Sequence, residues 1–511
     1  MNNTKDLVLL YSPKSTPENL RHIGIPLSLL AVGTPVSKLG YKVKIVDGNV
    51  DDASYQTAAP YLDKTLCIGV TSMTGPQINA ALNFIKEVKK NYPDIPIVWG
   101  GFHPTILPLQ TLATPYADIV VKGMGETTFS QVVKAIDKGE KFDNILGIAY
   151  KQDGRIIENE DRPIEDINDF PPLDYELLDD VEKYIVSTPY APKTIDYISS
   201  YGCPFNCGFC AEIKMHKRKW TGLSAERVYG DIKKLKEKYS INGIRIADNL
   251  FFTNEKRLEK ICRLLIDNDI NVKWGNVNSR TTQLANFSDD MWSLLQKAGL
   301  SNVLIGAESG DPEILKFLNK EATVDDTINA KKLCSKYGVS VFISLLIGLP
   351  HGDHKKLKET LKKDFMVNLN FINKIQEIDQ NHHVALFIYA PFPGSPLYDL
   401  SVKLGFPEPK SLEEWGMINL NTSKLPWVDK KYLKIVEMLS NYIFIYGTAY
   451  HYDSDYKNPK FKLFHSMLRK TALLRLKYKF FAFPIDYYLL KHITKSDFGK
   501  KLLAFMKKLL K

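Results

Sequence analysis

The stretch Cys203-Pro204-Phe205-Asn206-Cys207-Gly208-Phe209-Cys210 places three thiols within eight residues, at the spacing C-x3-C-x2-C. The chain has only six cysteines in 511 residues, so metal ligation is a better interpretation of these three than a disulfide framework. Iron–sulfur clusters are usually held by four thiolates, so a cluster on three leaves one iron open to an exogenous ligand. Structural zinc is the alternative, but zinc requires four protein ligands and no second cysteine or histidine pair stands nearby in the sequence.

The three cysteines follow the first strand of a series in which strand-like and helix-like segments alternate from Thr194 onward. The predicted strands are residues 196–200, 243–247, 272–277, 302–305, 339–347 and 384–389. Six such units indicate an open, partial (β/α)6 barrel, in which the chemistry lies at the carboxyl ends of the strands.

Strand-like and helix-like segments also alternate in the first 150 residues, which predicts a separate parallel α/β sheet. Ligands bind such sheets at the carboxyl ends of the strands, and three predicted strands end here in glycine-containing loops, at residues 71–75, 100–103 and 123–126. Each loop alone is explained as a tight turn, whereas three loops on one edge indicate a binding site.

The regions beyond the sheet are separated by changes in composition. Residues 152–192 are polar and acidic and contain Asp169-Phe170-Pro171-Pro172, which is typical of a linker. The predicted fold class is therefore α/β, with a Rossmann-like domain at 1–150, a linker at 151–192, a partial barrel at 193–400 and a helical, lysine-rich extension at 401–511.

The three-cysteine stretch resembles the motif of the radical S-adenosylmethionine (SAM) superfamily, which has this spacing and usually an aromatic residue before the third cysteine, as Phe209 is here. The resemblance implies a [4Fe–4S] cluster on Cys203, Cys207 and Cys210, with SAM at the open iron. It also implies that the strand ends carry the contacts to SAM, namely Phe209, Asp248, Asn249, Asn278, Ser279, Arg280, Glu308 and Ser309.

By this resemblance, Asp248-Asn249 occupies the position where the family orients the methionine amino group of SAM. Residues 278–280 occupy the position where the family contacts the ribose and the carboxylate of SAM. Glu308 is an expected polar contact to SAM. The segments 348–350 and 391–396 resemble the loops that close the last strands.

The N-terminal region resembles the cobalamin-binding domain that precedes the barrel in one large branch of the superfamily. The resemblance implies cobalamin contacts from Ser72, Thr74, Gly75, Gly100, Gly101, His103, Gly123, Gly125 and Glu126. The Asp-x-His-x-x-Gly loop that ligates cobalt in many such domains does not occur in this sequence. We therefore expect cobalamin without a histidine lower ligand, and His103 lining the loop rather than binding cobalt.

The resemblance implies an enzyme that cleaves SAM to a 5′-deoxyadenosyl radical and transfers a methyl group from cobalamin to an unactivated carbon of a small molecule. A reductant such as flavodoxin or ferredoxin would supply the electron. Two alternatives stay open: cobalamin-assisted oxidative cyclisation or another radical rearrangement, as in the anaerobic magnesium-porphyrin cyclase, and a non-catalytic iron–sulfur binding or regulatory protein.

Basic charge is concentrated at the C-terminus, where residues 457–511 contain fifteen basic and two acidic residues. On a helical projection, Phe498, Leu502, Phe505, Met506 and Leu509 share one face and lysines the other. Such a helix suits peripheral membrane contact and a hydrophobic or lipid substrate, although it equally suits a solvated face over the barrel. Nucleic acid is not expected, because the related tRNA-thiolating enzymes carry three further N-terminal cysteines and Cys67 stands alone.

The start of the chain is not typical of a signal peptide, because its apolar run, Leu7–Leu10, is too short. We therefore expect a cytoplasmic protein, either free or on the inner face of the membrane. The remaining cysteines, Cys67, Cys262 and Cys334, are expected to be small buried hydrophobic residues without a chemical role.

Overall fold

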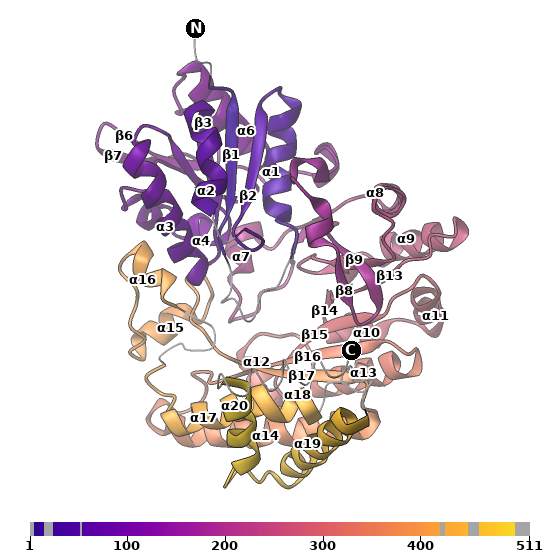
Figure 1. Cartoon of the computed structure of the whole chain (residues 1–511). Coiled ribbons are helices and arrows are strands. Elements are labelled where there is room, and N and C mark those ends of the chain that lie inside the picture. Colours follow the sequence, from indigo (N-terminus) through magenta and orange to yellow (C-terminus); the bar gives the residue numbers. More distant parts are fainter. Residues whose placement is uncertain (1–4, 15–23, 52–53, 419–424, 448–458, 496–511) are drawn as a thin grey trace. The chain divides into compact units, whose positions relative to one another are not determined.

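The computed structural model describes residues 5–14, 24–51, 54–418, 425–447 and 459–495 (Figure 1). The predicted amphipathic helix at 498–511 lies outside these residues. The chain divides into a first unit, made of Met1–Asn278, Lys297–Gly299 and Ala390–Ser423, and a second unit, made of Ser279–Gln296, Leu300–Tyr389 and Lys424–Lys511. The two units are described separately below.

The first unit begins with a seven-stranded sheet in the order β2-β1-β3-β4-β5-β6-β7, whose first five strands are parallel. The strands are β1 (Leu7–Ser12), β2 (Lys42–Asp47), β3 (Thr65–Thr71), β4 (Ile97–Gly100), β5 (Ile119–Val121), β6 (Ile148–Gln152) and β7 (Arg155–Glu158). The helices between them are α1 (Leu27–Lys38), α2 (Ser54–Ala58), α3 (Pro76–Asn91), α4 (Phe102–Ile106), α5 (Pro108–Leu112) and α6 (Glu126–Lys138). The predicted Rossmann-like sheet is thus confirmed, but antiparallel β6 and β7 extend it to Glu158, beyond the expected boundary at residue 150.

The apolar composition of the central strands follows from their place in this sheet. All six residues of β1 are buried, as expected for a parallel strand covered on both faces. On β3, a Cβ atom at Gly69 would lie 2.8 Å from Leu10 Cδ2 and 3.0 Å from Phe129 Cζ, so only glycine lets helix α6 pack this closely. Helix α6 in turn packs beside α1 (Figure 1).

The barrel-type strands form two four-stranded sheets, β13-β12-β9-β8 and β14-β15-β16-β17. The strands are β8 (Val186–Thr188), β9 (Ala191–Tyr197), β12 (Gly243–Ile246), β13 (Lys273–Gly275), β14 (Val277–Ser279), β15 (Asn302–Glu308), β16 (Ser340–Ile347) and β17 (His382–Ile388). The predicted third strand is divided into β13 and β14 at Asn276, which has a left-handed φ of 60°. The boundary between the two units falls within β14.

Helices follow most of these strands, which gives the βα alternation expected from the sequence. In the first unit they are α7 (Glu212–His216), α8 (Ala225–Tyr239) and α9 (Glu255–Asp267), and a hairpin of β10 (Ser200–Gly202) and β11 (Trp220–Gly222) lies between β9 and α8 in sequence. In the second unit they are α10 (Thr281–Asn286), α11 (Asp289–Lys297), α12 (Pro312–Phe317), α13 (Val324–Lys336) and α14 (Leu357–Ile378). The β10–β11 hairpin was not predicted.

The C-terminal extension is helical, as predicted, but it does not form one block. Helices α15 (Tyr398–Lys403) and α16 (Leu412–Gly416) belong to the first unit, where α16 packs against α3. Helices α17 (Lys430–Met438), α18 (Phe444–Gly447), α19 (Pro459–Tyr478) and α20 (Ile485–Lys495) belong to the second unit, with a π-helical turn at Leu439–Ile443.

Across the parts of the chain that the structure describes, no helix is both long and apolar enough to cross a lipid bilayer.

Trp415 anchors α16, so we expect its loss to destabilise the first unit. The Trp415 side chain is 1% exposed and its Nε1 donates to Gln110 Oε1 at 2.6 Å. Trp415→Ala should lower the free energy of unfolding by about 3–5 kcal/mol, because it leaves a cavity and an unpaired amide. Urea denaturation followed by intrinsic fluorescence measures this. The matched control is Met417→Ala, at a side chain that is 70% exposed, which should change stability by less than about 0.5 kcal/mol.

Candidate active site

The three cysteines of the predicted cluster site lie on one loop between β10 and α7 in the first unit. Cys207 is buried and the other two are half-buried, and the Cys210 amide donates to the Cys207 carbonyl at 3.1 Å. Leu397, the residue after the predicted closing segment 391–396, contacts this loop, since its amide donates to the Gly208 carbonyl at 2.9 Å. All six cysteines of the chain are described, and none of them forms a disulfide.

The chemistry of this loop fits an iron–sulfur cluster. Burial raises the pKa of the Cys210 thiol to about 12, and the neighbouring thiols of Cys207 and Cys203 act in the same direction. Among the described residues, no three His, Cys, Asp or Glu side chains are arranged to hold a single metal ion. The thiolates of a four-iron cluster bind different irons and need not converge on one point, so three soft ligands on one loop suit a cluster.

Asp248, whose contact to the methionine amino group stays a prediction, is held by hydrogen bonds within the protein. Its side chain is completely buried, and its carboxylate accepts hydrogen bonds from the Ser199 amide and hydroxyl, both at 2.7 Å, and from the Ser200 hydroxyl. Burial raises the pKa of this carboxyl group. Because its oxygens face these serines, Asp248 is a positioning residue that fixes the backbone leading into the cysteine loop.

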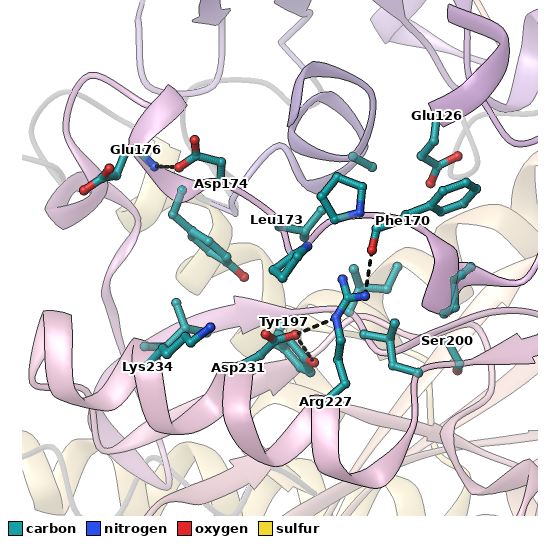
Figure 2. Close-up of a pocket in the computed structure, with 18 of the residues that line it drawn as sticks. Glu126, Phe170, Leu173, Asp174, Glu176, Tyr197, Ser200, Arg227, Asp231 and Lys234 are labelled. Carbon is teal, nitrogen blue, oxygen red and sulfur yellow. Dashed lines mark hydrogen bonds and ion pairs between the residues drawn. The ribbon is translucent and has the colours of Figure 1, made fainter. Parts of the chain in front are cut away.

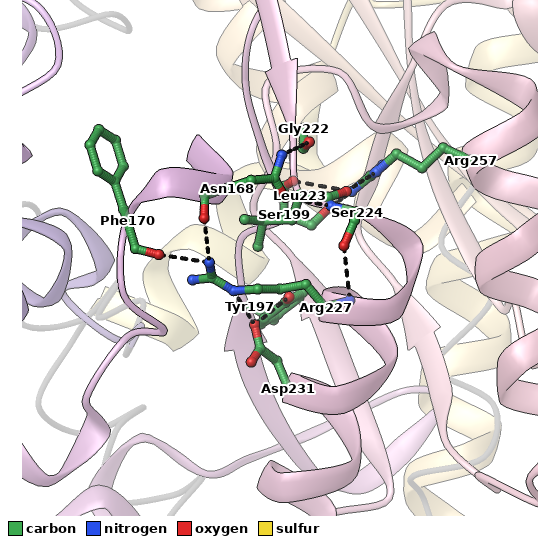
Figure 3. A network of polar contacts seen from close by, with 10 residues as sticks. All are labelled: Asn168, Phe170, Tyr197, Ser199, Gly222, Leu223, Ser224, Arg227, Asp231 and Arg257. Carbon is green, nitrogen blue, oxygen red and sulfur yellow. Dashed lines mark hydrogen bonds and ion pairs between the residues drawn. The ribbon is translucent and has the colours of Figure 1, made fainter. Parts of the chain in front are cut away.

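Arg257 on α9 completes this buried arrangement. It donates to the Ser199 hydroxyl at 2.8 Å and, through Nε, to the Leu223 carbonyl at 2.6 Å (Figure 3). The opposite charges of Arg257 and Asp248 thus approach the same serine from two sides. Sequence reasoning missed Arg257, which stands in an ordinary amphipathic helix without any motif around it.

The neighbouring predicted contacts are better placed to meet a ligand. Asn249 is exposed at the carboxyl end of β12, where its Oδ1 accepts a hydrogen bond from the Gly202 amide at 3.4 Å, next to Cys203. Asn278 is half-buried, and its Nδ2 donates to the Asp248 carbonyl at 2.9 Å. The first unit therefore brings Asn249, Asn278 and the start of the cysteine loop into one hydrogen-bonded region.

Apart from Phe209 on the cysteine loop, the remaining predicted SAM contacts belong to the second unit. Glu308 ends β15 at a bulge, with a left-handed φ of 60°, and its buried carboxylate accepts from Lys320 Nζ at 2.8 Å. Such a conformation is strained for a residue with a side chain and persists where the surroundings enforce it. Ser309 and the Gly310 amide both contact Asn368 Oδ1 on α14, at 3.3 and 2.8 Å.

The other two predicted contacts in this unit are buried near the start of α10. Ser279 donates through its hydroxyl to the Leu304 carbonyl at 2.9 Å, and Arg280 is 4% exposed. These four residues stay predicted SAM contacts.

The predicted cobalamin site is a largely apolar cavity of about 210 Å³ in the first unit. The carboxyl ends of β3, β4 and β5 form it, and the predicted residues in its wall are Gly100, Gly101, Gly123, Gly125 and Glu126. A Cβ atom at Gly100 would have no neighbour closer than 4.0 Å, and one at Gly123 would have none within 4 Å. The glycines therefore leave open space that admits part of a bulky cofactor, which is the fit expected of a cobalamin cradle.

Four of the predicted cobalamin residues, Ser72, Thr74, Gly75 and His103, do not line this cavity. His103 is completely buried, with its Nδ1 2.9 Å from the Thr74 hydroxyl and its ring 5.7 Å from that of Trp415. Burial lowers the pKa of His103 to about 4, so the imidazole is neutral. The ring thus packs between Thr74 of the loop and Trp415 of α16, and the place of His103 at the binding loop stays a prediction from the sequence.

The opposite wall of the cavity comes from the segment that carries the cysteines. Tyr201, Met215 and His216 line it together with Glu126. The pKa of the buried Glu126 carboxyl is raised by burial, and Tyr201 is its hydrogen-bonding neighbour. His216 is paired through Nδ1 with Glu212 on the same helix. None of Tyr201, Met215 and His216 was predicted, because no motif marks them in the sequence.

A second cavity of about 210 Å³ lies between the linker segment 167–176 and helix α8 (Figure 2). Its polar groups are bonded within the protein. Arg227 donates to the Phe170 carbonyl at 2.7 Å, and Asp231 accepts from the Tyr197 hydroxyl at 3.1 Å (Figures 2 and 3). Asn168 continues this network, since its Oδ1 accepts from the Ser224 amide at 2.8 Å. We interpret these contacts as the attachment of the linker to α8, not as a ligand site.

Comparisons with known proteins agree with this arrangement. Residues 197–363 match the Radical SAM superfamily, and residues 18–133 match the B12 binding domain. An uncharacterized methyltransferase of Pyrococcus horikoshii is 29% identical over 77% of this chain and 83% of its own length. The anaerobic magnesium-protoporphyrin IX monomethyl ester cyclase of Rubrivivax gelatinosus is 31% identical over 58% of this chain and 53% of its own.

The fold is shared with a solved structure, that of the cobalamin-dependent SAM radical enzyme OxsB with aqua-cobalamin and SAM bound. The TM-score is 0.70 at 19% sequence identity, over 99% of this chain and 75% of that one. The chain therefore carries a radical SAM domain and, before it in the sequence, a B12-binding domain. It is an enzyme, and its cofactors are a [4Fe–4S] cluster, SAM and cobalamin.

Asp364 on α14 gives the second unit a pH dependence. The residue is 6% exposed, its Oδ2 has no hydrogen-bond partner among the described residues, and burial, with a smaller effect of Asp311, raises its pKa to about 6. The native state therefore binds a proton near pH 5 that the unfolded chain, with a pKa near 3.8, does not hold. Stability should rise as the pH falls from about 7 to about 5, with the gain complete near pH 4.

Asp364→Asn should remove this part of the pH dependence and make the protein more stable than the wild type at pH 8. Thermal unfolding midpoints between pH 5 and pH 8 measure the effect, with Asp325→Asn at an exposed position as control. Identical pH profiles of the wild type and Asp364→Asn would contradict the assignment.

Proposed function

We propose that this enzyme is a cobalamin-dependent C-methyltransferase that acts on an unactivated carbon of a small hydrophobic or lipid molecule. The observation that carries the proposal is that one unit holds both the cysteine loop and the glycine-lined cavity. Met215 and His216, five and six residues after Cys210, form part of the wall of that cavity. The relative from Pyrococcus horikoshii, a methyltransferase by name, supports it.

When bound, a reduced [4Fe–4S] cluster with SAM supplies a 5′-deoxyadenosyl radical, and methylcobalamin supplies a methyl group. The chain's own part is binding, orientation and exclusion of water. Cys203, Cys207 and Cys210 hold the cluster, and Asp248 fixes their loop through Ser199 and Ser200.

As predicted from the sequence, the polar contacts to SAM fall to Asn249, Asn278, Ser279, Arg280, Glu308 and Ser309, and Phe209 supplies an apolar contact. The glycine loops and Glu126 face cobalamin. No histidine lower ligand is part of the proposal. An external reductant such as flavodoxin or ferredoxin supplies the electron.

Oxidative cyclisation is the second candidate, because a magnesium-protoporphyrin cyclase is also among the relatives. The two reactions differ in what reaches the product. With SAM labelled as CD3, a methyltransferase adds three mass units of deuterium label to the product as an intact methyl group, whereas a cyclase adds no label. Extracts of a deletion strain supply the accumulated substrate for this assay.

The cluster assignment is tested by replacing Cys203, Cys207 and Cys210 with alanine together. After anaerobic reconstitution, the wild type should bind about four irons and release 5′-deoxyadenosine from SAM with dithionite, and the triple variant should do neither, because the thiolates are its cluster ligands. Cys262→Ala, at a buried cysteine away from the loop, is the control and should keep both properties. Full iron content in the triple variant would refute the assignment.

The cobalamin cavity is tested by filling it. A Cβ atom at Gly100 would have no neighbour closer than 4.0 Å, so Gly100→Leu should leave the fold intact while lowering cobalamin affinity by at least about tenfold through steric exclusion. The absorbance spectrum of the protein after incubation with hydroxocobalamin and gel filtration measures the bound fraction. Gly230→Leu on α8, which also meets no atom within 4 Å, is the control. Equal cobalamin content in both variants would place the cofactor elsewhere.

A further inference from the structure

Half of the large apolar side chains that are exposed in the described residues fall in one short stretch of the second unit. Residues 467–489, which we name the apolar hairpin, comprise the end of α19, a turn and the start of α20. Its exposed members are Met467, Leu474, Tyr478, Phe480, Phe483, Ile485, Tyr488 and Leu489, each more than half exposed. Scattered apolar residues on a surface need no explanation, whereas eight in 23 residues mark an interaction site.

The exposed residues of each helix share one face. On α19, Met467, Leu474 and Tyr478 are spaced by seven and four residues, which is one side of a helix. The opposite side of the same helix is buried, with Ala472 and Leu476 completely inaccessible. Helix α19 thus has apolar residues on both sides. Packing within the second unit accounts for the side with Ala472 and Leu476, but not for the exposed side.

The turn between the helices is rigidly built. The Arg475 guanidinium donates to the carbonyls of Phe480 and Phe483, at 3.0 and 3.1 Å, and pairs with both oxygens of Asp486, at 2.8 and 2.7 Å. These bonds join the last turn of α19 to the first turn of α20. The arginine therefore fixes the backbone that carries the exposed phenylalanines, which reduces the entropy lost when they bind.

The three phenylalanines of the turn point in different directions. Phe481 packs inward, with its ring 6.4 Å from that of Phe365 on α14. Phe480 and Phe483 are 51% and 78% exposed. The inward ring holds the turn to the unit, and the two outward rings remain at its tip for an external partner.

The charge of the apolar hairpin indicates the partner. The hairpin has five basic residues and one acidic residue, and the acid, Asp486, is already paired with Arg475. Lys470 and Lys477 are exposed beside the apolar face. Aliphatic and aromatic side chains flanked by cations suit the boundary between acyl chains and anionic headgroups, where each cation contributes about 1 kcal/mol. Nucleic acid would use the cations but not the exposed Met467, Leu474, Ile485 and Leu489.

We propose that the apolar hairpin binds the surface of an anionic lipid bilayer, with the tip aromatics inserted and the lysines at the headgroups. The hairpin lies on the bilayer rather than across it. This inference is independent of the proposed reaction, since no residue of the hairpin belongs to the cluster, SAM or cobalamin sites. It would bring the enzyme to hydrophobic substrates dissolved in the membrane.

The test is co-sedimentation of the full-length reconstituted enzyme with vesicles of phosphatidylcholine containing one quarter phosphatidylglycerol. Phe480→Ser combined with Phe483→Ser should weaken binding by about tenfold or more, because two buried aromatic rings are lost. The matched control is Leu39→Ser combined with Leu109→Ser, two exposed leucines of the first unit, which should bind as the wild type does. Lys470→Glu with Lys477→Glu should lose the preference for anionic over pure phosphatidylcholine vesicles.

A second measurement keeps the fold intact. Phe483→Trp should show fluorescence quenching by brominated lipids that the wild type lacks. Release of 5′-deoxyadenosine from SAM should be unchanged in every hairpin variant, which separates this proposal from the proposed function.

Three outcomes would overturn the proposal. The first is equal sedimentation of the wild type and the double phenylalanine variant. The second is binding that disappears on removal of residues 496–511 but not on substitution of the two phenylalanines. The third is a dimer in solution that the double variant dissociates without any change in sedimentation, because a second copy of the chain then covers the hairpin.

Discussion

The carboxylate of Asp248 is completely buried, and the cysteine loop depends on it. Two serines that precede the loop donate to it, and Arg257 donates to one of those serines from the other side. A buried carboxylate is stable only when hydrogen-bond donors satisfy it, and a buried acceptor that loses its donor typically costs about 1–3 kcal/mol, and more when it is charged. The backbone from β9 into β10 therefore has little freedom, and the three thiols that follow start from a fixed position.

Glycines determine both the cavity and the helix packing of the N-terminal sheet. Its strands end in glycines whose missing side chains leave the cavity open, while Gly69 lets α6 approach the sheet closely. The cavity is completed by Tyr201, Met215 and His216, which flank the cysteine loop in sequence. The cysteine loop and the glycine-lined cavity are thus built from neighbouring parts of the same chain segment.

The C-terminal helices have two different roles, one in each unit. Helix α16 seals the first unit by placing Trp415 against Gln110 and His103, whereas α19 and α20 keep an apolar face outward in the second unit. In the apolar hairpin, Arg475 stabilises the turn from inside and leaves the aromatic tips without intramolecular burial. This exposed apolar face is not part of the cluster, SAM or cobalamin sites. We therefore infer that it binds another surface.

The sequence by itself determined the fold class and both domain types. Periodicity is local, so alternating apolar segments predicted the strands of both regions, and the spacing of three cysteines within eight residues was enough to predict them as cluster ligands. It also predicted the glycine loops, because glycines directly after a strand indicate a ligand-binding loop at the carboxyl end of a parallel sheet.

Only the tertiary structure decided which polar residues of these loops are buried and bonded within the protein. Asp248 and His103 stand in the expected loops but are buried. Serines bond to Asp248, and Thr74 and Trp415 contact His103, and all of these partners are far from them in the sequence. Arg257, Tyr201 and His216 carry no motif, and their contacts join residues that are 15 to 58 positions apart in the sequence. Burial and partner choice depend on packing between elements, and a linear pattern does not contain that information.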